Sequence, residues 1–104
     1  MPRFVILEHD HPERHWDFML EVDGVLRTWK LSAPPRVDEP MPATASFDHR
    51  LMYLDYEGPV SGNRGSVVIW DRGTFAGDPG NRGTRVVVQL EGQKLRGTAI
   101  LEVE

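Results

Sequence analysis

Three residues near the start of the chain have the types and the spacing of metal ligands: His9, His15 and Asp17. His15 and Asp17 are two residues apart in a segment that alternates polar with apolar side chains, so in a strand both project from one face. Because the opposite face of that strand is apolar throughout, we expect the polar face to line a cavity or the surface rather than the core. Two imidazoles and one carboxylate suit a transition metal with open coordination positions, and either manganese or zinc would fit.

Spacing alone leaves the third ligand open. His9 follows a short apolar run, residues 4–8, and lies across a brief connection from His15. His11 comes two residues after His9 and could be the ligand in its place. Histidines beside turns are also commonly solvated or hydrogen-bonded to backbone groups, so the pattern by itself is compatible with a site that holds no metal.

Short strands are the elements that must position these side chains. Apolar or alternating runs bounded by Gly, Pro or Asp predict strands at 4–8, 15–22, 25–31, 66–71, 84–90 and 94–103. Residues 51–56 fit either a strand or irregular structure. Asp23-Gly24 predicts a two-residue hairpin turn, and further turns are expected at 71–73 and 91–92.

Proline and glycine predict long loops at 32–46, 57–65 and 75–83. No helix-length segment has a period of 3.6, and no repeat is visible. About seven short strands at this spacing predict a mainly all-β fold. We expect residues 1–104 to form a compact, antiparallel, β-barrel-like single domain with long loops.

Composition narrows the function further. The 104 residues are 39% hydrophobic and 27% charged, which is typical of a globular domain. The absence of cysteine excludes a disulfide framework, a thiolate metal site and a cysteine nucleophile. A formal charge of −4 is unusual for a general nucleic-acid binder, so any nucleic-acid contact should be local, at a strand end. The N-terminal apolar run is too short for a signal peptide or membrane span, and we expect a cytoplasmic location.

A longer pattern surrounds the histidines. Residues 8–21 read Glu-His-Asp-His-Pro-Glu-Arg-His-Trp-Asp-Phe-Met-Leu-Glu. This segment resembles the 3′-phosphoesterase domain of bacterial DNA ligase D, whose pattern is a His-Asp pair, a short spacer and then His-aromatic-Asp-Phe-Arg-Leu-Glu. The likeness continues in order through 23–26, 29, 48–53, 55–58, 62–63, 65, 68–74 and 94–97. The chain thus looks like a stand-alone, minimal and divergent member of that family.

The resemblance implies a barrel-like fold and an activity at 3′ ends of DNA or RNA-tailed DNA. The family removes a terminal ribonucleoside and then a 3′-phosphate, with manganese as the cofactor. Carried onto this sequence, His9 rather than His11 joins His15 and Asp17 as a metal ligand. His49 would contact the scissile phosphate as a general acid, and Tyr53 would hydrogen-bond either a phosphate oxygen or the metal-bound water. A separate ligase or polymerase would be the expected partner.

The chain departs from the family at cations that grip phosphate. Met19, Met41 and Ala33 stand where the family has two arginines and a lysine. A methionine or alanine supplies neither charge nor a strong hydrogen-bond donor.

Three arginines are candidates to replace the missing cations: Arg14, Arg50 and Arg64. Arg64 lies in Gly62-Asn63-Arg64-Gly65, whose backbone N–H groups could form an anion-binding nest. The sequence is also compatible with two other functions. One is a metal-binding module for nucleic-acid ends or repair partners without catalysis. The other is a hydrolase of small phosphoesters, which the acidic charge would suit.

Overall fold

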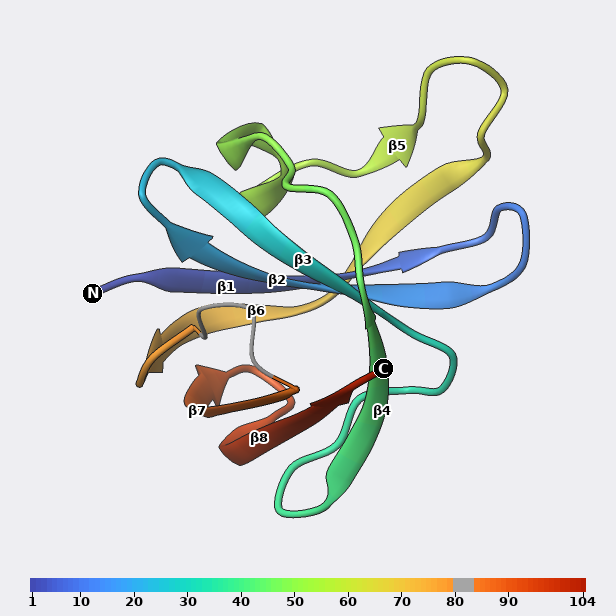
Figure 1. Cartoon of the computed structure of the whole chain (residues 1–104). Coiled ribbons are helices and arrows are strands. Elements are labelled where there is room, and N and C mark those ends of the chain that lie inside the picture. Colours follow the sequence, from blue (N-terminus) through green and yellow to red (C-terminus); the bar gives the residue numbers. More distant parts are fainter. Residues whose placement is uncertain (80–83) are drawn as a thin grey trace.

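The computed structural model describes residues 1–79 and 84–104, and strands account for most of them (Figure 1). The elements are β1 (Arg3–His9), β2 (His15–Val22), β3 (Val25–Leu31), β4 (Pro40–Ala45), the short 3-10 helix η1 (Leu51–Leu54), β5 (Gly58–Pro59), β6 (Ser66–Ala76), β7 (Arg85–Gly92) and β8 (Arg96–Val103). Within the described residues no helix is long or apolar enough to cross a membrane.

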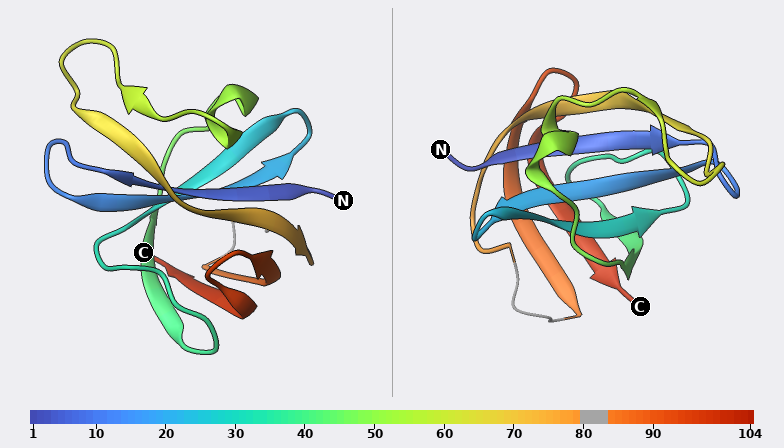
Figure 2. Two further views of the ribbon diagram at one scale, coloured as in Figure 1. Left: turned by 180° about the vertical axis from the view of Figure 1, so that it is seen from behind. Right: turned by 90° about the horizontal axis from the view of Figure 1, so that it is seen from above.

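Seven of the strands close into a barrel. The order of hydrogen-bonded neighbours is β1-β2-β3-β4-β8-β7-β6, and β6 pairs again with β1 to complete the ring. Every pair around the ring is antiparallel except β4 with β8. The strands wrap around one another in both views of Figure 2, with β5 as a short addition along β6. The mainly all-β, barrel-like prediction is confirmed.

The first hairpins follow the predicted pattern. Asp23 and Gly24 both have positive φ, at 49° and 83°, as a tight hairpin turn requires. Counting outward from Val22, which lies opposite Val25, the register places Asp17 opposite Lys30.

Two predicted irregular segments contain strand. The loop expected at 32–46 includes β4, whose partners β3 and β8 lie on either side of it in the barrel. The turn expected at 71–73 is wrong, because β6 runs through it and continues to Ala76. Gly73 lies where β6 passes from β1 to β7, and a Cβ there would approach the Glu91 carbonyl oxygen to 1.9 Å. Gly73 therefore lets β6 pass close to β7 and continue, instead of ending the strand.

The remaining boundaries shift by a few residues. The segment 51–56 is the 3-10 helix η1 rather than a strand, and the turn expected at 91–92 forms the end of β7. Part of the loop expected at 75–83 belongs to β6, and residues 80–83 lie outside the described part of the chain.

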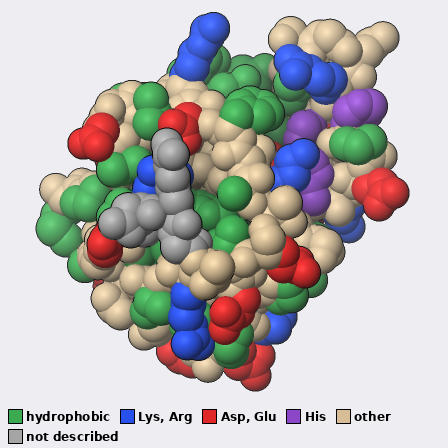
Figure 3. Space-filling view, in the orientation of Figure 1, with side chains coloured by type: hydrophobic (Ala, Val, Ile, Leu, Met, Phe, Trp, Pro, Cys, Tyr) green, Lys and Arg blue, Asp and Glu red, His purple; other side chains and the backbone are tan. Residues whose placement is uncertain are grey.

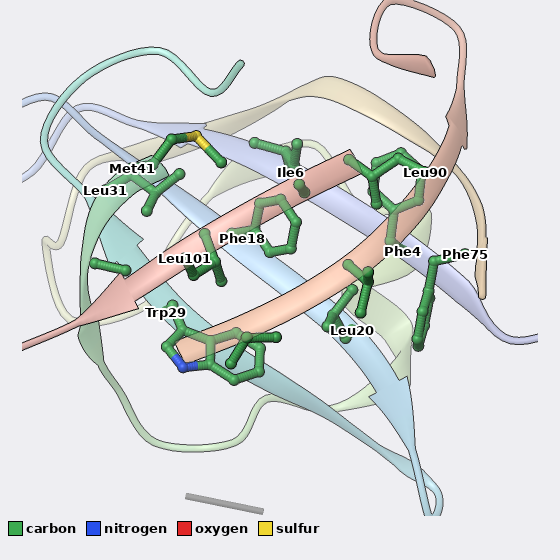
Figure 4. Packing of buried hydrophobic residues seen from close by; sticks show 14 of the residues in the cluster. Phe4, Ile6, Phe18, Leu20, Trp29, Leu31, Met41, Phe75, Leu90 and Leu101 are labelled. Atoms are coloured by element: carbon green, nitrogen blue, oxygen red, sulfur yellow. The ribbon is translucent and has the colours of Figure 1, made fainter. Parts of the chain in front are cut away.

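Two apolar clusters lie on the two sides of the barrel wall. The larger one fills the interior, where side chains from all around the ring point toward one another, as Figure 4 shows for Phe18, Leu101 and Trp29. Met41 belongs to this interior cluster, so that position faces the core and offers nothing to a phosphate. Ala33 is exposed in the connection between β3 and β4.

The smaller cluster lies outside the barrel, beneath η1 and the chain around it. Its buried members are Val5, Leu7, Met19, Leu26, Leu54 and Val67. Met19 is 0% exposed, so the expectation that its whole strand face lines a cavity or the surface is wrong for this half of β2. The segment 49–60 covers that half, and the end of β2 that carries His15 and Asp17 lines a cavity.

Candidate metal centre and surrounding cavity

His9, His15 and Asp17, which we call the ligand cluster, converge at one end of the first hairpin. His9 ends β1 and lies directly opposite His15, which begins β2, and Asp17 follows on the same face. One ligand atom from each residue lies within 4.8 Å of the others. An Asp17 carboxylate oxygen is 3.2 Å from His15 Nε2, and the other is 3.7 Å from His9 Nδ1. The antiparallel register, together with the period of two along β2, brings the three side chains together.

Backbone carbonyls fix which nitrogen of each imidazole faces the cluster. His9 Nε2 lies 2.7 Å from the carbonyl oxygen of Arg64, and His15 Nδ1 lies 2.9 Å from that of Glu13. A carbonyl only accepts, so each of these nitrogens carries the hydrogen. The lone pairs of the neutral rings are then on His9 Nδ1 and His15 Nε2, the two atoms nearest Asp17. Metal-binding histidines use the same arrangement of an outer carbonyl partner.

The donor set fits a divalent metal ion. His15 Nε2 is buried and makes no hydrogen bond within the described structure, although Asp17 is close to it. The Asp17 carboxylate is 5% exposed. A buried lone pair beside a buried carboxylate is costly without a cation between them, and two nitrogens with one carboxylate oxygen suit manganese or zinc.

His11, which lies between His9 and His15 in the sequence, occupies a different position in the structure. His11 is exposed and lines the cavity, but it is not a member of the cluster whose ligand atoms converge. The geometry therefore groups His9, and not His11, with His15 and Asp17.

A second loop holds His9 in place. The Asp10 carboxylate accepts a hydrogen bond of 2.8 Å from the backbone N–H of Ser66, and this N–H is the main cause of the lowered pKa of Asp10. The bond ties the turn after β1 to the loop before β6, which lie side by side in Figure 1. Gly65 permits this approach, because its φ is +73° and a Cβ would lie 2.2 Å from Asp10 Oδ1. Arg64, in the same loop, thereby brings its carbonyl to His9.

His49 lies next to the cluster although it is distant in sequence. Its backbone pairs with Leu26 through two hydrogen bonds of 2.8 Å. Its Nδ1 lies 3.0 Å from the Phe47 carbonyl oxygen and 2.9 Å from the Thr28 hydroxyl, so Nδ1 carries the hydrogen and Nε2 is the free nitrogen. Burial lowers the pKa of His49, and the negative charge of Asp17 opposes only part of that effect. The neutral ring is therefore favoured in the metal-free protein.

Tyr53 is brought to the same place by η1. Its ring meets the His49 ring edge-on, with centroids 5.6 Å apart, and it meets Tyr56 in the same manner at 5.5 Å. The structure thus places both predicted catalytic residues side by side. Both residues line an outer cavity of about 330 Å³, which His9, Arg50 and Arg64 also line.

The three arginines proposed from the sequence are not equivalent. Arg64 lines both the outer cavity and a smaller ligand cavity of about 140 Å³ around the cluster. Its guanidinium donates to the Ser61 carbonyl at 2.8 Å. Arg50 lines the outer cavity but not the ligand cavity. Arg14 is paired with Glu8 at 2.8 Å and lines a different hollow, so it is not brought to the ligand cavity.

Lys30 is a cation at the site that the sequence interpretation missed. It lies opposite Asp17 in the register of β2 and β3 and lines the ligand cavity together with His9, His15 and His49. It forms no ion pair with any residue that the structure describes. Figure 3 shows histidines gathered on one side of the molecule with Lys and Arg side chains beside them. The available signal was the Asp23-Gly24 turn, since its two-residue length sets the register that places Lys30 there.

Comparison with known proteins identifies the same family that the sequence pattern resembles. Residues 7–102 match the family model described as the DNA Ligase D 3′-phosphoesterase domain. The chain is 35% identical to the multifunctional non-homologous end joining protein LigD of Pseudomonas aeruginosa, over 91% of this chain and 12% of that protein. It is 36% identical to LigD of Mycobacterium tuberculosis, over 90% and 13%, and 30% identical to LigD of Mycolicibacterium smegmatis, over 91% and 14%. The chain therefore spans only about an eighth of the length of these relatives. On the match across nearly all of its residues, this chain belongs to the DNA ligase D 3′-phosphoesterase domain family.

Proposed function

We propose that this chain is a manganese-dependent phosphoesterase that trims 3′ ends of DNA or RNA-tailed DNA during end joining. It would remove a terminal ribonucleoside and then a 3′-phosphate, leaving a 3′-hydroxyl. The observation that carries the proposal is the convergence of the ligand cluster, His49, Lys30 and Arg64 on one cavity. The names of the relatives, which refer to non-homologous end joining, support the setting and suggest a ligase or polymerase as partner.

The ligand cluster would hold the metal through His9 Nδ1, His15 Nε2 and the Asp17 carboxylate. These three residues would hold a divalent ion, which would supply Lewis-acid polarisation of a phosphoryl oxygen and a more acidic water molecule. Zinc is the alternative to manganese, since the donor set accepts both.

The protein's own residues would bind the phosphate and move the proton. Lys30 and Arg64 line the ligand cavity and supply charge-assisted hydrogen bonds to phosphate oxygens. His49 would act as the general acid: beside a bound phosphate its Nε2 would take up a proton from solvent and donate it to the leaving oxygen. Tyr53, beside His49, would donate a hydrogen bond to a phosphate oxygen.

The test is a primer with a single 3′-ribonucleotide, incubated with the protein and manganese. We expect loss of the ribonucleoside followed by loss of the 3′-phosphate, and we expect Asp17→Asn to abolish both. His11→Ala is the matched control, since His11 lines the cavity outside the ligand cluster. Absence of trimming by the wild-type chain, under conditions where another family member trims, would overturn the proposal.

A specific observation also supports a binding module without catalysis. Arg64 is engaged with Ser61 and Arg14 with Glu8, while Met19 and Met41 are buried in the two apolar clusters. The family's cations are thus only partly replaced. Metal binding and affinity for a 3′-phosphorylated end, without turnover of any phosphoester, would favour this function. Turnover of small phosphoesters with no preference for polynucleotides would instead indicate a small-phosphoester hydrolase.

A further inference from the structure

Phe47 is an exposed aromatic side chain at the edge of the site. It is 69% exposed, although a phenylalanine is ordinarily placed in a core. The ring lies flat against His49, with centroids 4.7 Å apart and an angle of 15° between the planes. One face is thus covered by the histidine that we place in the reaction. A single exposed apolar residue needs no explanation by itself, so the argument depends on where this ring lies and how it is held.

The backbone around Phe47 is fixed on both sides. The Ser46 N–H donates to the Thr28 carbonyl at 3.0 Å, and His49 pairs with Leu26 in an isolated bridge. The Phe47 carbonyl in turn accepts from His49 Nδ1 at 3.0 Å. The ring is therefore held in position before any ligand binds, which reduces the entropy lost on binding.

Phe47 forms a wall shared by three hollows. It lines the ligand cavity, the outer cavity, and a third cavity of about 430 Å³ that Trp29 and Arg27 also line. A group bound at the metal ligands and a group lying on the free part of this ring would be neighbours. A nucleotide has such a pair of groups, a phosphate and an adjoining flat base.

The charged residues around the Phe47 ring favour a nucleic-acid end over an apolar protein segment as the ligand of this surface. Lys30, Arg50 and Arg64 line the cavities on which Phe47 borders, so the surroundings favour an anionic chain. Asp48 also lines the outer cavity and disfavours a bare phosphate at that point. A neutral base stacked on an aromatic ring, with its phosphate at the cations and metal ligands, satisfies both conditions.

We propose that Phe47 is a stacking platform for a nucleobase of the strand whose phosphate occupies the ligand cavity. The proposal rests on the function proposed above and adds a specificity-determining residue to it. Because stacking uses the face of a base, the preference would be for any polynucleotide end over a small phosphoester, with little dependence on sequence. Met52, which is also exposed and lines the outer cavity, can adapt to the base from another side.

The experiment measures binding of a fluorescent single-stranded oligonucleotide by anisotropy, in manganese, with a non-hydrolysable 3′-methylenephosphonate in place of the 3′-phosphate so that the end is not trimmed during the measurement. A second oligonucleotide lacks the two bases nearest its 3′ end. Phe47→Ala should weaken binding of the intact end about 5- to 100-fold and leave the abasic end unchanged. Phe47→Trp should retain the preference for the intact end. Val87→Ala is the matched control, because it removes an exposed apolar side chain on β7, outside these cavities.

The outcomes separate this inference from the function on which it rests. Equal binding of the intact end by wild type and Phe47→Ala would overturn the platform while leaving 3′-end trimming standing. Equal losses for intact and abasic ends would mean that the ring merely supports His49, which also overturns it. Failure of the wild-type chain both to bind the intact end and to trim the 3′-ribonucleotide primer would overturn both proposals.

Discussion

His15 Nε2 and an oxygen of Asp17 lie 3.2 Å apart in a buried position, and no hydrogen bond joins them. Nδ1 of the same ring lies at the Glu13 carbonyl and donates to it, so the lone pair of the neutral imidazole is on Nε2. In that form the lone pair and the carboxylate repel each other, and a bound cation would reverse that interaction. The geometry therefore predicts both metal affinity and stabilisation of the fold by metal.

Replacing Asp17 with Asn should weaken manganese binding by at least about 100-fold, because the negative ligand is lost. In the wild type, free manganese at 100 times its Kd should add about 2.7 kcal/mol to the free energy of unfolding. Titration calorimetry gives the first quantity, and thermal unfolding with and without a chelator gives the second. His11→Ala should change neither. If His11→Ala weakens binding and His9→Ala does not, the choice of His9 as a ligand is wrong.

Gly65→Ala should weaken metal binding although Gly65 is not a ligand. The new Cβ would lie 2.2 Å from Asp10 Oδ1, so the loop must move and take the Arg64 carbonyl away from His9. Loss of an outer partner typically weakens metal affinity 10- to 100-fold. Gly24→Ala is the matched control, since it has a similar positive φ of +83° and nothing within 4 Å of the added Cβ. Gly24→Ala should lower stability slightly and leave the metal affinity unchanged. Equal metal affinities for Gly65→Ala and Gly24→Ala would contradict the role of the loop that contains Gly65.

His49 should titrate below the ordinary histidine range in the metal-free protein, because burial lowers its pKa from 6.5. Between the lowered pKa and 6.5 the unfolded chain binds more protons than the folded chain, so the free energy of unfolding decreases as the pH falls through this window. NMR of the imidazole resonances gives the midpoint, and the denatured chain is the reference. A midpoint at or above 6.5 in the folded protein would contradict the neutral starting state of His49.

Asp71 should be essential for stability rather than for binding. Its buried carboxylate accepts backbone hydrogen bonds from Arg72 and from residues 93, 94 and 95, at 2.8 to 3.1 Å. Asn at this position would turn an amide group toward N–H donors, which should cost about 3 kcal/mol. Urea unfolding measures the change, and Asp55→Asn, which alters an exposed pair with Arg72, is the control. A change below about 0.5 kcal/mol for Asp71→Asn would show that these bonds contribute little.

Asp71 also illustrates where sequence patterns stop being informative. Asp followed by Arg-Gly is typical of a turn, yet here the carboxylate is satisfied by backbone groups of the distant connection between β7 and β8. The proline-rich β4 was missed for a similar reason, because its parallel partner β8 comes from the far end of the sequence. Local alternation and Asp23-Gly24 were sufficient for the first hairpins, where partners are near in sequence.

The candidate site, like the fold, contains residues that local sequence patterns place and one residue that depends on a long-range contact. Alternation places His15 and Asp17 on one face, and the short connection brings His9 opposite His15. The position of His49 depends on its bridge to Leu26, a contact between segments that no local pattern links. The chain-long family resemblance supplied that residue, whereas the register of the first hairpin would have been enough to find Lys30.

Lys30→Ala should therefore impair phosphate binding more than Arg14→Ala does. Lys30 lines the ligand cavity without an ion-pair partner among the described residues. It also lines the hollow that holds Arg14, but Arg14 is paired with Glu8 and does not line the ligand cavity. Loss of one charge-assisted phosphate contact should lower kcat/KM for a 3′-phosphorylated end about 10-fold or more. Lys30→Arg should restore part of it, because the charge returns with a different geometry. Measured with saturating manganese, Arg14→Ala should stay near wild type, and the reverse order of the two alanine variants would place the phosphate on the other side of His15.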